Sequence, residues 1–238
     1  MALPKLNETA KYSVKIPSTG ETVRYRPYLV KEEKVLMLAL EQGEEQASLE
    51  AIADTIEACV DESINARNLP IFDIEYLFTQ IRSKSVGETT TINAKCSHCS
   101  APNEIDIDIS KINIKVPKSA NAKLIKLSPD IILEMKYPTI KDIAPRMNKY
   151  KDGSQTDQAF DMIAQCIDAV QMKDERFSLA DETDEEINAF IESFSTDQFM
   201  KVRDFIEGMP RLKHEVEFKC GSCGHDNTLT LQGTADFF

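Results

Sequence analysis

Two short stretches decide the fold: KCSHCS at residues 95–100 and KCGSCG at residues 219–224. Each is a CxxC motif, with two residues between two thiols, and each lies between segments that have a strand pattern. A tight turn between two strands directs both sulfurs to one side, which is how a zinc knuckle is built. Two knuckles supply four thiolates, the number that a tetrahedral structural zinc site requires. The predicted metal ligands are Cys96, Cys99, Cys220 and Cys223.

Four other interpretations of these motifs remain open at the level of sequence. A thioredoxin-like redox pair normally opens a helix, whereas strand patterns flank both motifs here. A catalytic zinc keeps an open coordination position, which four cysteines would close. His98 or His225 could replace a cysteine as a ligand, but with four cysteines available we expect both to be turn residues. The fourth interpretation is a set of buried thiols that holds no metal.

The CxxC motifs belong to a longer internal repeat. Residues 14–16 match 125–127, and the helical pattern of 49–58 matches that of 160–169, both 111 positions further on. The two CxxC motifs are 124 positions apart, so the second copy carries 13 extra residues, which we place near the acidic stretch 181–186. Chance likeness between amphipathic helices explains the helix match alone, and not matches that run in order through strand, helix and motif.

The repeat predicts an α+β fold, rich in helices, with two pseudo-equivalent halves. Residues 1–118 would hold a β-hairpin, helices and the first CxxC knuckle. Residues 119–238 would follow the same plan, with an acidic helical insertion and the second knuckle. If a pseudo-two-fold relates the halves, the two knuckles meet and one four-cysteine zinc site joins the halves.

Periodicity and turn signals place the elements of each half. In the first half we expect strands at 12–16 and 22–25, a helix at 31–42, a helix capped by Ser48 that runs to Val60, a helix from Asp73 and a strand at 104–109. In the second half we expect a helix at 157–170, a helix with a capping box at Thr183 and Glu186, a helix from Thr196 that ends at Gly208, and strands at 215–219 and 228–231.

Composition narrows the functional classes. The chain has 238 residues, of which 42% are hydrophobic and 29% charged, which is typical of a globular protein. The 28 Lys and Arg residues against 40 Asp and Glu residues give a net charge of −12. Such a surface repels phosphate backbones and anionic membranes, so we expect neither nucleic acid nor membrane as a partner. Two of the six cysteines, Cys59 and Cys166, lie in helical patterns and are expected to pack as small apolar residues.

The N-terminal sequence has no basic segment followed by an apolar one, so we expect no secretory signal. The longest uninterrupted apolar run is residues 35–40, whereas a membrane-spanning helix needs about 20 apolar residues. We therefore expect a soluble protein made in a reducing cytoplasm. In that compartment, paired cysteines hold a metal more often than they form permanent disulfides.

The motifs of common enzyme classes are missing from the sequence. It has no glycine-rich phosphate loop, no HExxH and no GxSxG, and its three histidines offer little general-base machinery. The many carboxylates follow helix faces and caps, where a solvated charge is the simplest interpretation. We therefore expect neither an enzyme nor a small-molecule substrate.

The N-terminal region resembles a known family. Residues 16–20 read IPSTG and residues 25–34 read YRPYLVKEEK, followed by an apolar helix. With the paired CxxC motifs, this region resembles the baseplate hub and hub-assembly proteins of T-even-type contractile-tailed bacteriophages. The resemblance implies a non-enzymatic structural or assembly protein whose partners are other phage tail or baseplate hub proteins. It implies a location in the host cytoplasm during assembly or in the virion tail baseplate.

Two further functions and two roles for the RPYLVKEEK block are left as alternatives. An Arg beside an aromatic and apolar residues is a typical interface anchor; otherwise the block is a strand end that leads into a helix, with Tyr28 and Leu29 in the core. The second function is a zinc-ribbon regulator that binds nucleic acid, and the third is a thiol oxidoreductase. The regulator would use a local basic patch formed by Lys95, Lys111, Lys115, Lys118, Lys213 and Lys219.

Overall fold

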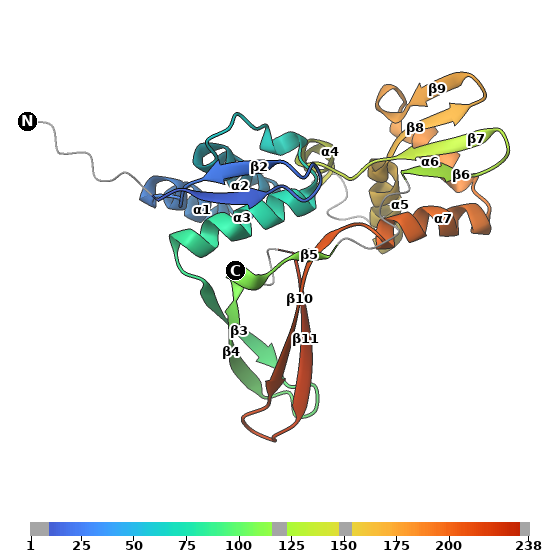
Figure 1. Ribbon diagram of the computed structural model, residues 1–238. Coiled ribbons are helices and arrows are strands. Elements are labelled where there is room, and N and C mark those ends of the chain that lie inside the picture. The colour runs from blue at the N-terminus through green and yellow to red at the C-terminus, as the bar shows by residue number, and fades with distance from the viewer. Residues whose placement is uncertain (1–9, 116–122, 148–153, 234–238) are drawn as a thin grey trace, which may run out of the picture. The chain divides into compact units, whose positions relative to one another are not determined.

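The computed structural model describes residues 10–115, 123–147 and 154–233 (Figure 1). The chain forms two compact units. Unit 1 combines Met1–Lys115 with Arg211–Phe238, and unit 2 is Val116–Pro210. Each unit has its own hydrophobic core and is described by itself.

Unit 1 begins with a β-hairpin and three helices. Strands β1 (Tyr12–Lys15) and β2 (Thr22–Tyr25) pair antiparallel, and Val14 opposite Val23 gives the hairpin its buried face. Gly20 takes the left-handed conformation in the turn, with φ at 75°. Helix α3, predicted from Asp73, has an apolar face on which Ile74, Leu77 and Ile81 are buried. The helices are α1 (Val30–Gln42), α2 (Glu45–Cys59) and α3 (Ile71–Ser85), with a short 3-10 helix η1 at Ala66–Asn68.

Two long hairpins complete unit 1. Strand β3 (Thr89–Lys95) pairs with β4 (Pro102–Asp108), and β10 (Arg211–Lys219) pairs with β11 (Asp226–Gln232). The short strand β5 (Ile114–Lys115), which follows the 3-10 helix η2 (Ile109–Lys111), pairs with the start of β10. Both hairpins contribute side chains to one core, which contains Ala94, Ile105, Ile107, Ile109, Ile112, Leu212 and Leu231.

Unit 2 is a four-stranded antiparallel sheet with helices. The strand order is β6-β7-β8-β9, and its core includes Leu133, Ile167 and Val202. The strands are β6 (Leu124–Lys126), β7 (Ile131–Met135), β8 (Ile167–Met172) and β9 (Glu175–Ser178). The helices are α4 (Ile140–Met147), α5 (Gln155–Cys166), α6 (Asp184–Glu192) and α7 (Thr196–Glu207), with a 3-10 helix η3 at Leu179–Asp181.

The predicted mixture of helices and small antiparallel sheets is confirmed, with seven α-helices and four sheets in the described ranges. The helix expected at 157–170 is wrong, because α5 ends at Cys166 and strand β8 begins at Ile167. Ile167 and Ala169 are both buried, so this segment satisfies the alternation of a strand as well as the spacing of a helix. Sequence periodicity alone did not separate the two.

Helix starts show which capping signals were reliable. The capping box at Thr183 and Glu186 is present and opens α6 as predicted. Ser48 is not an N-cap, because α2 already begins at Glu45 with Glu44 in the cap position. Ser48 instead donates its backbone N–H to the Glu44 carbonyl inside the first turn of the helix.

The predicted halves 1–118 and 119–238 do not coincide with the compact units. The chain from Arg211 onward, which belongs to the second predicted half, lies in unit 1 with the first. The halves describe a repeat in the sequence and stay a prediction, whereas the units describe how the folded chain divides.

Candidate metal centre

The tips of the two long hairpins of unit 1 bring the four predicted ligands together. The Sγ atoms of Cys96 and Cys223 are 3.7 Å apart, as are those of Cys99 and Cys220. All four sulfurs lie within 4.8 Å of one another. A tetrahedral ion with four bonds of about 2.3 Å holds neighbouring sulfurs roughly 3.8 Å apart. The spacing of the thiols therefore fits a single metal ion held by four cysteines.

The two CxxC turns share one backbone design. In the first, the Cys96 N–H donates to the Ala101 carbonyl, and the Ser100 N–H donates to the Cys96 carbonyl, both over 2.9 Å. The second turn has the same two bonds at the same lengths, 124 positions further on. Ser100 is left-handed with φ at 60°, and Gly224 takes the corresponding place with φ at 73°. Each turn is thus a compact loop that presents two sulfurs on one side.

Two asparagines connect the turns to each other. Asn227 Oδ1 accepts the backbone N–H of Ser97, and Asn103 Oδ1 accepts the backbone N–H of Gly221, both at 2.9 Å. Each asparagine also donates its amide to a carbonyl of its own turn at 2.9 Å. The exchange is reciprocal, so each hairpin holds the turn of the other. The asparagines lie 124 positions apart, which is also the spacing of the two CxxC motifs, and this match is the sequence signal that could have identified them.

Backbone N–H groups aimed at sulfur prepare the thiols for ionisation. The N–H of Cys223 and that of Ser222 lower the pKa of Cys220 to about 6. The N–H of Cys99 lowers the pKa of Cys96 against the effect of desolvation, and that of His98 adds to it from 3.4 Å. Thiolate is the form that binds a metal, so these turns favour the binding form.

Crowding of the thiols has the opposite effect on the last of them. The backbone N–H of His225 lowers the pKa of Cys223. The hydrogen bond of Cys223 with Cys99, its desolvation and its contacts with Cys220 and Cys96 outweigh this effect and raise the pKa of Cys223 to about 12. Four thiolates at these distances repel one another strongly. A cation bound among them would remove this repulsion, so the four thiols could hold a metal ion.

His98, inside the first CxxC turn, and His225, directly after Gly224 of the second, are not part of the ligand group. Their rings stack on each other, with centroids 5.2 Å apart and planes 28° apart. Among the described residues, the four sulfurs alone make up the candidate metal group. His98 and His225 are therefore turn residues, as expected from the sequence. Both motifs also lie between strands and not at the start of a helix, which disfavours a redox pair.

Cys59 and Cys166 pack in the interior, as predicted. They are 1% and 0% exposed, and each is the last residue of a helix. Desolvation raises the pKa of Cys59 to about 11 and that of Cys166 to about 12. Neither belongs to the metal group.

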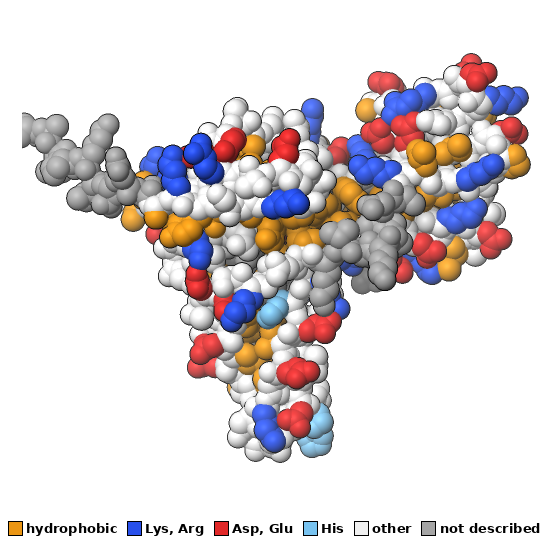
Figure 2. All heavy atoms as spheres, viewed as in Figure 1, with side chains coloured by type: hydrophobic (Ala, Val, Ile, Leu, Met, Phe, Trp, Pro, Cys, Tyr) orange, Lys and Arg blue, Asp and Glu red, His pale blue; other side chains and the backbone are white. Residues whose placement is uncertain are grey.

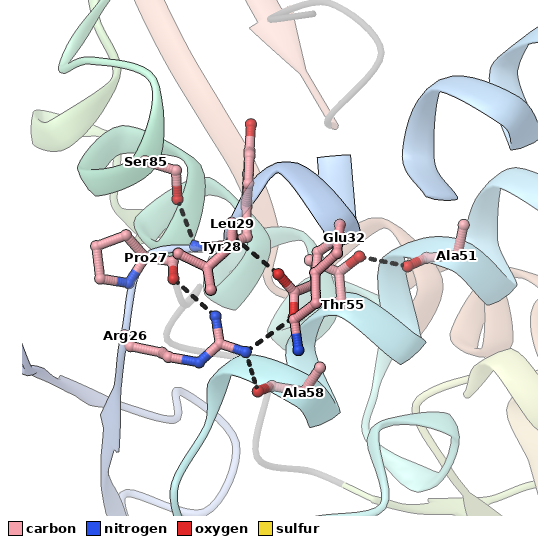
Figure 3. A network of polar contacts seen from close by, with 10 residues as sticks. Arg26, Pro27, Tyr28, Leu29, Glu32, Ala51, Thr55, Ala58 and Ser85 are labelled. Carbon is pink, nitrogen blue, oxygen red and sulfur yellow. Dashed lines mark hydrogen bonds and ion pairs between the residues drawn. The ribbon is translucent and has the colours of Figure 1, made fainter. Parts of the chain in front are cut away.

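A polar clamp around Arg26 explains the RPYLVKEEK block (Figure 3). The Arg26 guanidinium lies 2.8 Å from Glu32 Oε1 and donates to the Ala58 carbonyl at 2.9 Å and to the Pro27 carbonyl at 3.0 Å. The other oxygen of Glu32 accepts the Leu29 N–H at 2.8 Å. The clamp joins the end of β2, the start of α1 and the end of α2.

The clamp settles the alternatives for this block. Arg26 is turned inward, with 18% of its side chain exposed, so it is no surface anchor. The expectation that Leu29 lies in the core is wrong, since it is 40% exposed. Tyr28 is half-buried, and its backbone N–H is held by Ser85 Oγ at 2.9 Å. The block is the structural end of a strand and the cap of a helix.

Unit 2 contains a similar clamp, with Lys136 and Asp142 in place of Arg26 and Glu32. Lys136 Nζ lies 2.8 Å from Asp142 Oδ1, and Asp142 Oδ2 accepts the Thr139 N–H at 2.9 Å at the start of α4. The backbone N–H of Lys136 donates to the Cys166 carbonyl at 2.8 Å. In unit 1 the backbone N–H of Arg26 donates to the carbonyl at the end of α2 in the same way, at 3.0 Å.

Three lysines of the basic patch that a nucleic-acid regulator would need lie in ion pairs. Lys111, Lys213 and Lys219 each pair with a nearby carboxylate, at 2.6, 2.9 and 3.9 Å. Lys118 lies outside the described residues. On the face shown in Figure 2, acidic and basic side chains are intermixed over the hairpins of unit 1. This mixture of charges is unlike the basic surface that a phosphate backbone requires.

Comparison with known families adds one finding. The model of a family described as "T4 bacteriophage base plate protein" matches residues 9–238. No curated protein and no solved structure matches the chain. In the described part of the chain, every helix is too short or too polar to cross a membrane.

Proposed function

The chain belongs to the T4 bacteriophage base plate protein family, and from this premise we propose that it is a non-enzymatic structural or assembly protein of a contractile-tail baseplate hub. The family match over residues 9–238 is the observation that carries the proposal. In this role the protein works in the host cytoplasm during assembly or in the tail baseplate of the virion. Its partners are other tail or baseplate hub proteins.

Mass spectrometry of purified phage particles and of baseplate intermediates from infected cells tests this role. We expect the chain in one or both fractions, and we expect hub proteins to co-purify with it. Its presence in neither fraction, with no tail protein captured by the tagged full chain, would contradict the hub role.

We propose further that one zinc ion closes unit 1 through Cys96, Cys99, Cys220 and Cys223. The support is the set of sulfur separations, 3.7 Å for two pairs, in a group that consists of thiols alone. Four thiolates suit Zn²⁺ or iron in tetrahedral geometry. Iron bound by thiolates colours a protein and zinc does not, so a colourless protein would indicate zinc.

Metal analysis of the full chain tests the zinc site. We expect one zinc per chain and its loss in Cys99→Ser. His98→Ala is the matched control in the same turn, since the ring stacks on His225 outside the ligand group, and it should keep the metal. A chain without metal whose four thiols react freely in the folded state excludes the site.

We also propose that the two units share a duplicated module. The two clamps support this proposal. In each, a basic residue lies six positions before the acidic residue that caps the next helix. In each, the carbonyl of a buried cysteine also accepts the backbone N–H of that basic residue. In this correspondence Cys166 matches Cys59, which lies 107 positions earlier. The spacing of 111 positions seen in the sequence would instead match Cys166 with Thr55. A helix repeats its faces about every four residues, so an alignment displaced by one turn gives the same apolar match.

A further inference from the structure

Helix α1 buries Glu32 and Ala39 and half-buries Leu36, whereas five other large apolar residues of the helix are exposed. Only Glu32 and Ala39 are buried within it. A surface helix normally directs its apolar stripe to the core. The exposed fractions are 78% for Val30, 46% for Val35, 56% for Met37, 48% for Leu38 and 69% for Leu40.

The clamp explains how α1 stays in place with this orientation. Glu32 pairs with Arg26 at 2.8 Å and accepts the Leu29 N–H, so the helix is held to its own unit through a polar contact (Figure 3). The small side chain of Ala39 lets the next turn approach the unit. The residues of this outer face are exposed among the described residues, and an exposed apolar face of this kind marks an interaction site.

The outer face of α1 carries a basic residue, Lys34, near its N-terminal end and an acidic residue, Glu41, near its C-terminal end. At 100° per residue, the side opposite Glu32 and Ala39 carries Lys34, Met37 and Glu41, with Leu38 beside them. Lys34 lies one turn before the midpoint between Met37 and Leu38, and Glu41 lies one turn after it. Within the described part of the chain, neither charge has an ion-pair partner.

We propose that α1 pairs antiparallel with α1 of a second copy of this chain, about a two-fold axis level with Met37 and Leu38. In a pair centred there, Lys34 of one copy lies level with Glu41 of the other, and the two-fold axis generates this opposite-charge pair twice. The apolar side chains of Met37 and Leu38 meet at the centre. A two-fold interface must be self-complementary, and the charge order of α1 meets this condition. The proposal does not depend on the hub role or on the metal.

Sedimentation equilibrium of the full chain tests the apolar centre. We expect a reversible dimer whose dissociation constant rises by at least about tenfold in Met37→Glu with Leu38→Glu. Met162→Glu is the matched control, because Met162 is 41% exposed in unit 2 and should leave the dimer unchanged. Circular dichroism of each variant shows that the fold is kept. A chain that is monomeric at every concentration, or a dimer unaffected by the double variant, overturns the proposal.

Charge reversal separates a second copy from other occupants of the face. Lys34→Glu and Glu41→Lys should each weaken the dimer, since each places like charges level with each other twice. The double variant should restore the wild-type dissociation constant within about twofold, because the opposite-charge pairs are regenerated in reverse. Failure of this rescue, with the double variant as weak as the single ones, would mean that a different protein or another segment of this chain covers α1, and would exclude the antiparallel pair.

Discussion

Glu32 is a carboxylate that is 6% exposed and yet remains charged. Desolvation raises its pKa, but the hydrogen bond from Arg26, the Leu29 N–H and the contact with Lys31 outweigh this and lower the pKa to about 2. A group whose pKa is lowered on folding stabilises the protein above its ordinary pKa and loses this contribution as the pH falls to the folded value. For Glu32 that interval runs from 4.5 to about 2.

Glu32→Gln should therefore flatten the acid limb of the stability curve. The variant is less stable than the wild type at pH 7, and the gap narrows as the pH falls from about 4.5 to about 2. Urea unfolding at several pH values measures it. Glu33→Gln is the control, since Glu33 is exposed on the same turn. A gap that stays constant through this interval would show that the clamp does not depend on the charge of Glu32.

Asn227 connects the two CxxC turns and is 7% exposed. Its Oδ1 accepts the N–H and the hydroxyl of Ser97, at 2.9 and 2.8 Å. Asn227→Ala leaves the partly buried N–H of Ser97 without this acceptor, and we expect a loss of about 1–3 kcal/mol in the free energy of unfolding. Asn93→Ala, on the exposed face of β3, should change it by less than about 0.5 kcal/mol. Denaturant titration of the metal-loaded chain gives both values, and equal losses would refute the role of Asn227.

At the scale of elements, the two CxxC turns differ at one informative position. Ser100 and Gly224 both take left-handed φ values, 60° and 73°, which cost a residue with a side chain about 1–2 kcal/mol. A Cβ added at Gly224 would have no atom within 4 Å. The effect of a substitution there is therefore conformational and not steric.

Reciprocal substitutions in these turns should act in opposite directions. Ser100→Gly should stabilise unit 1 by about 0.5–1 kcal/mol, and Gly224→Ala should destabilise it by a similar amount. Thermal unfolding of the metal-loaded chain measures both shifts. A loss of stability in Ser100→Gly would show that the serine side chain has a role beyond its backbone conformation.

The elements also show where sequence patterns suffice. The CxxC spacing predicted the strand–turn–strand form of both knuckles because turn chemistry is local. The pattern of residues 157–170 did not reveal the change from α5 to β8, because pairing with β7, through Leu133 opposite Val170, decides it. The burial of Glu32 in α1 was equally hidden, since it depends on the contact between Glu32 and Arg26. Contacts between distant elements override local periodicity in both cases.

At the scale of the molecule, unit 1 is made of two chain segments that are far apart in sequence. Core side chains such as Ile107 and Leu212 and the pairing of β5 with β10 hold the segments together, and the four sulfurs come together from both segments. The sequence predicted that the knuckles meet, from their number and chemistry. It did not predict that Arg211 onward joins the first unit, because nothing local marks which core a strand enters.

Removal of the proposed metal should loosen unit 1 and leave unit 2 intact. The free energy with which four thiolates bind a zinc ion contributes to folding, on the order of 10 kcal/mol, and chelation removes this contribution. Hydrogen exchange of the full chain with and without chelator measures it. We expect faster exchange in β3, β4, β10 and β11, and unchanged exchange in β7 and β8, which belong to the separate core of unit 2. Uniform acceleration in both units would contradict this division.

The distance between the two knuckles along the chain also means that the ribosome makes the first knuckle well before the second. Cys99 is made 121 positions before Cys220. At roughly 5–20 residues per second, the first hairpin waits on the order of 6–24 s for its partner. The ribosome produces all of unit 2 during this interval, and a metal captured early has two thiolates of this chain to hold it. Unit 1 is therefore the first unit to be started and the last to be finished.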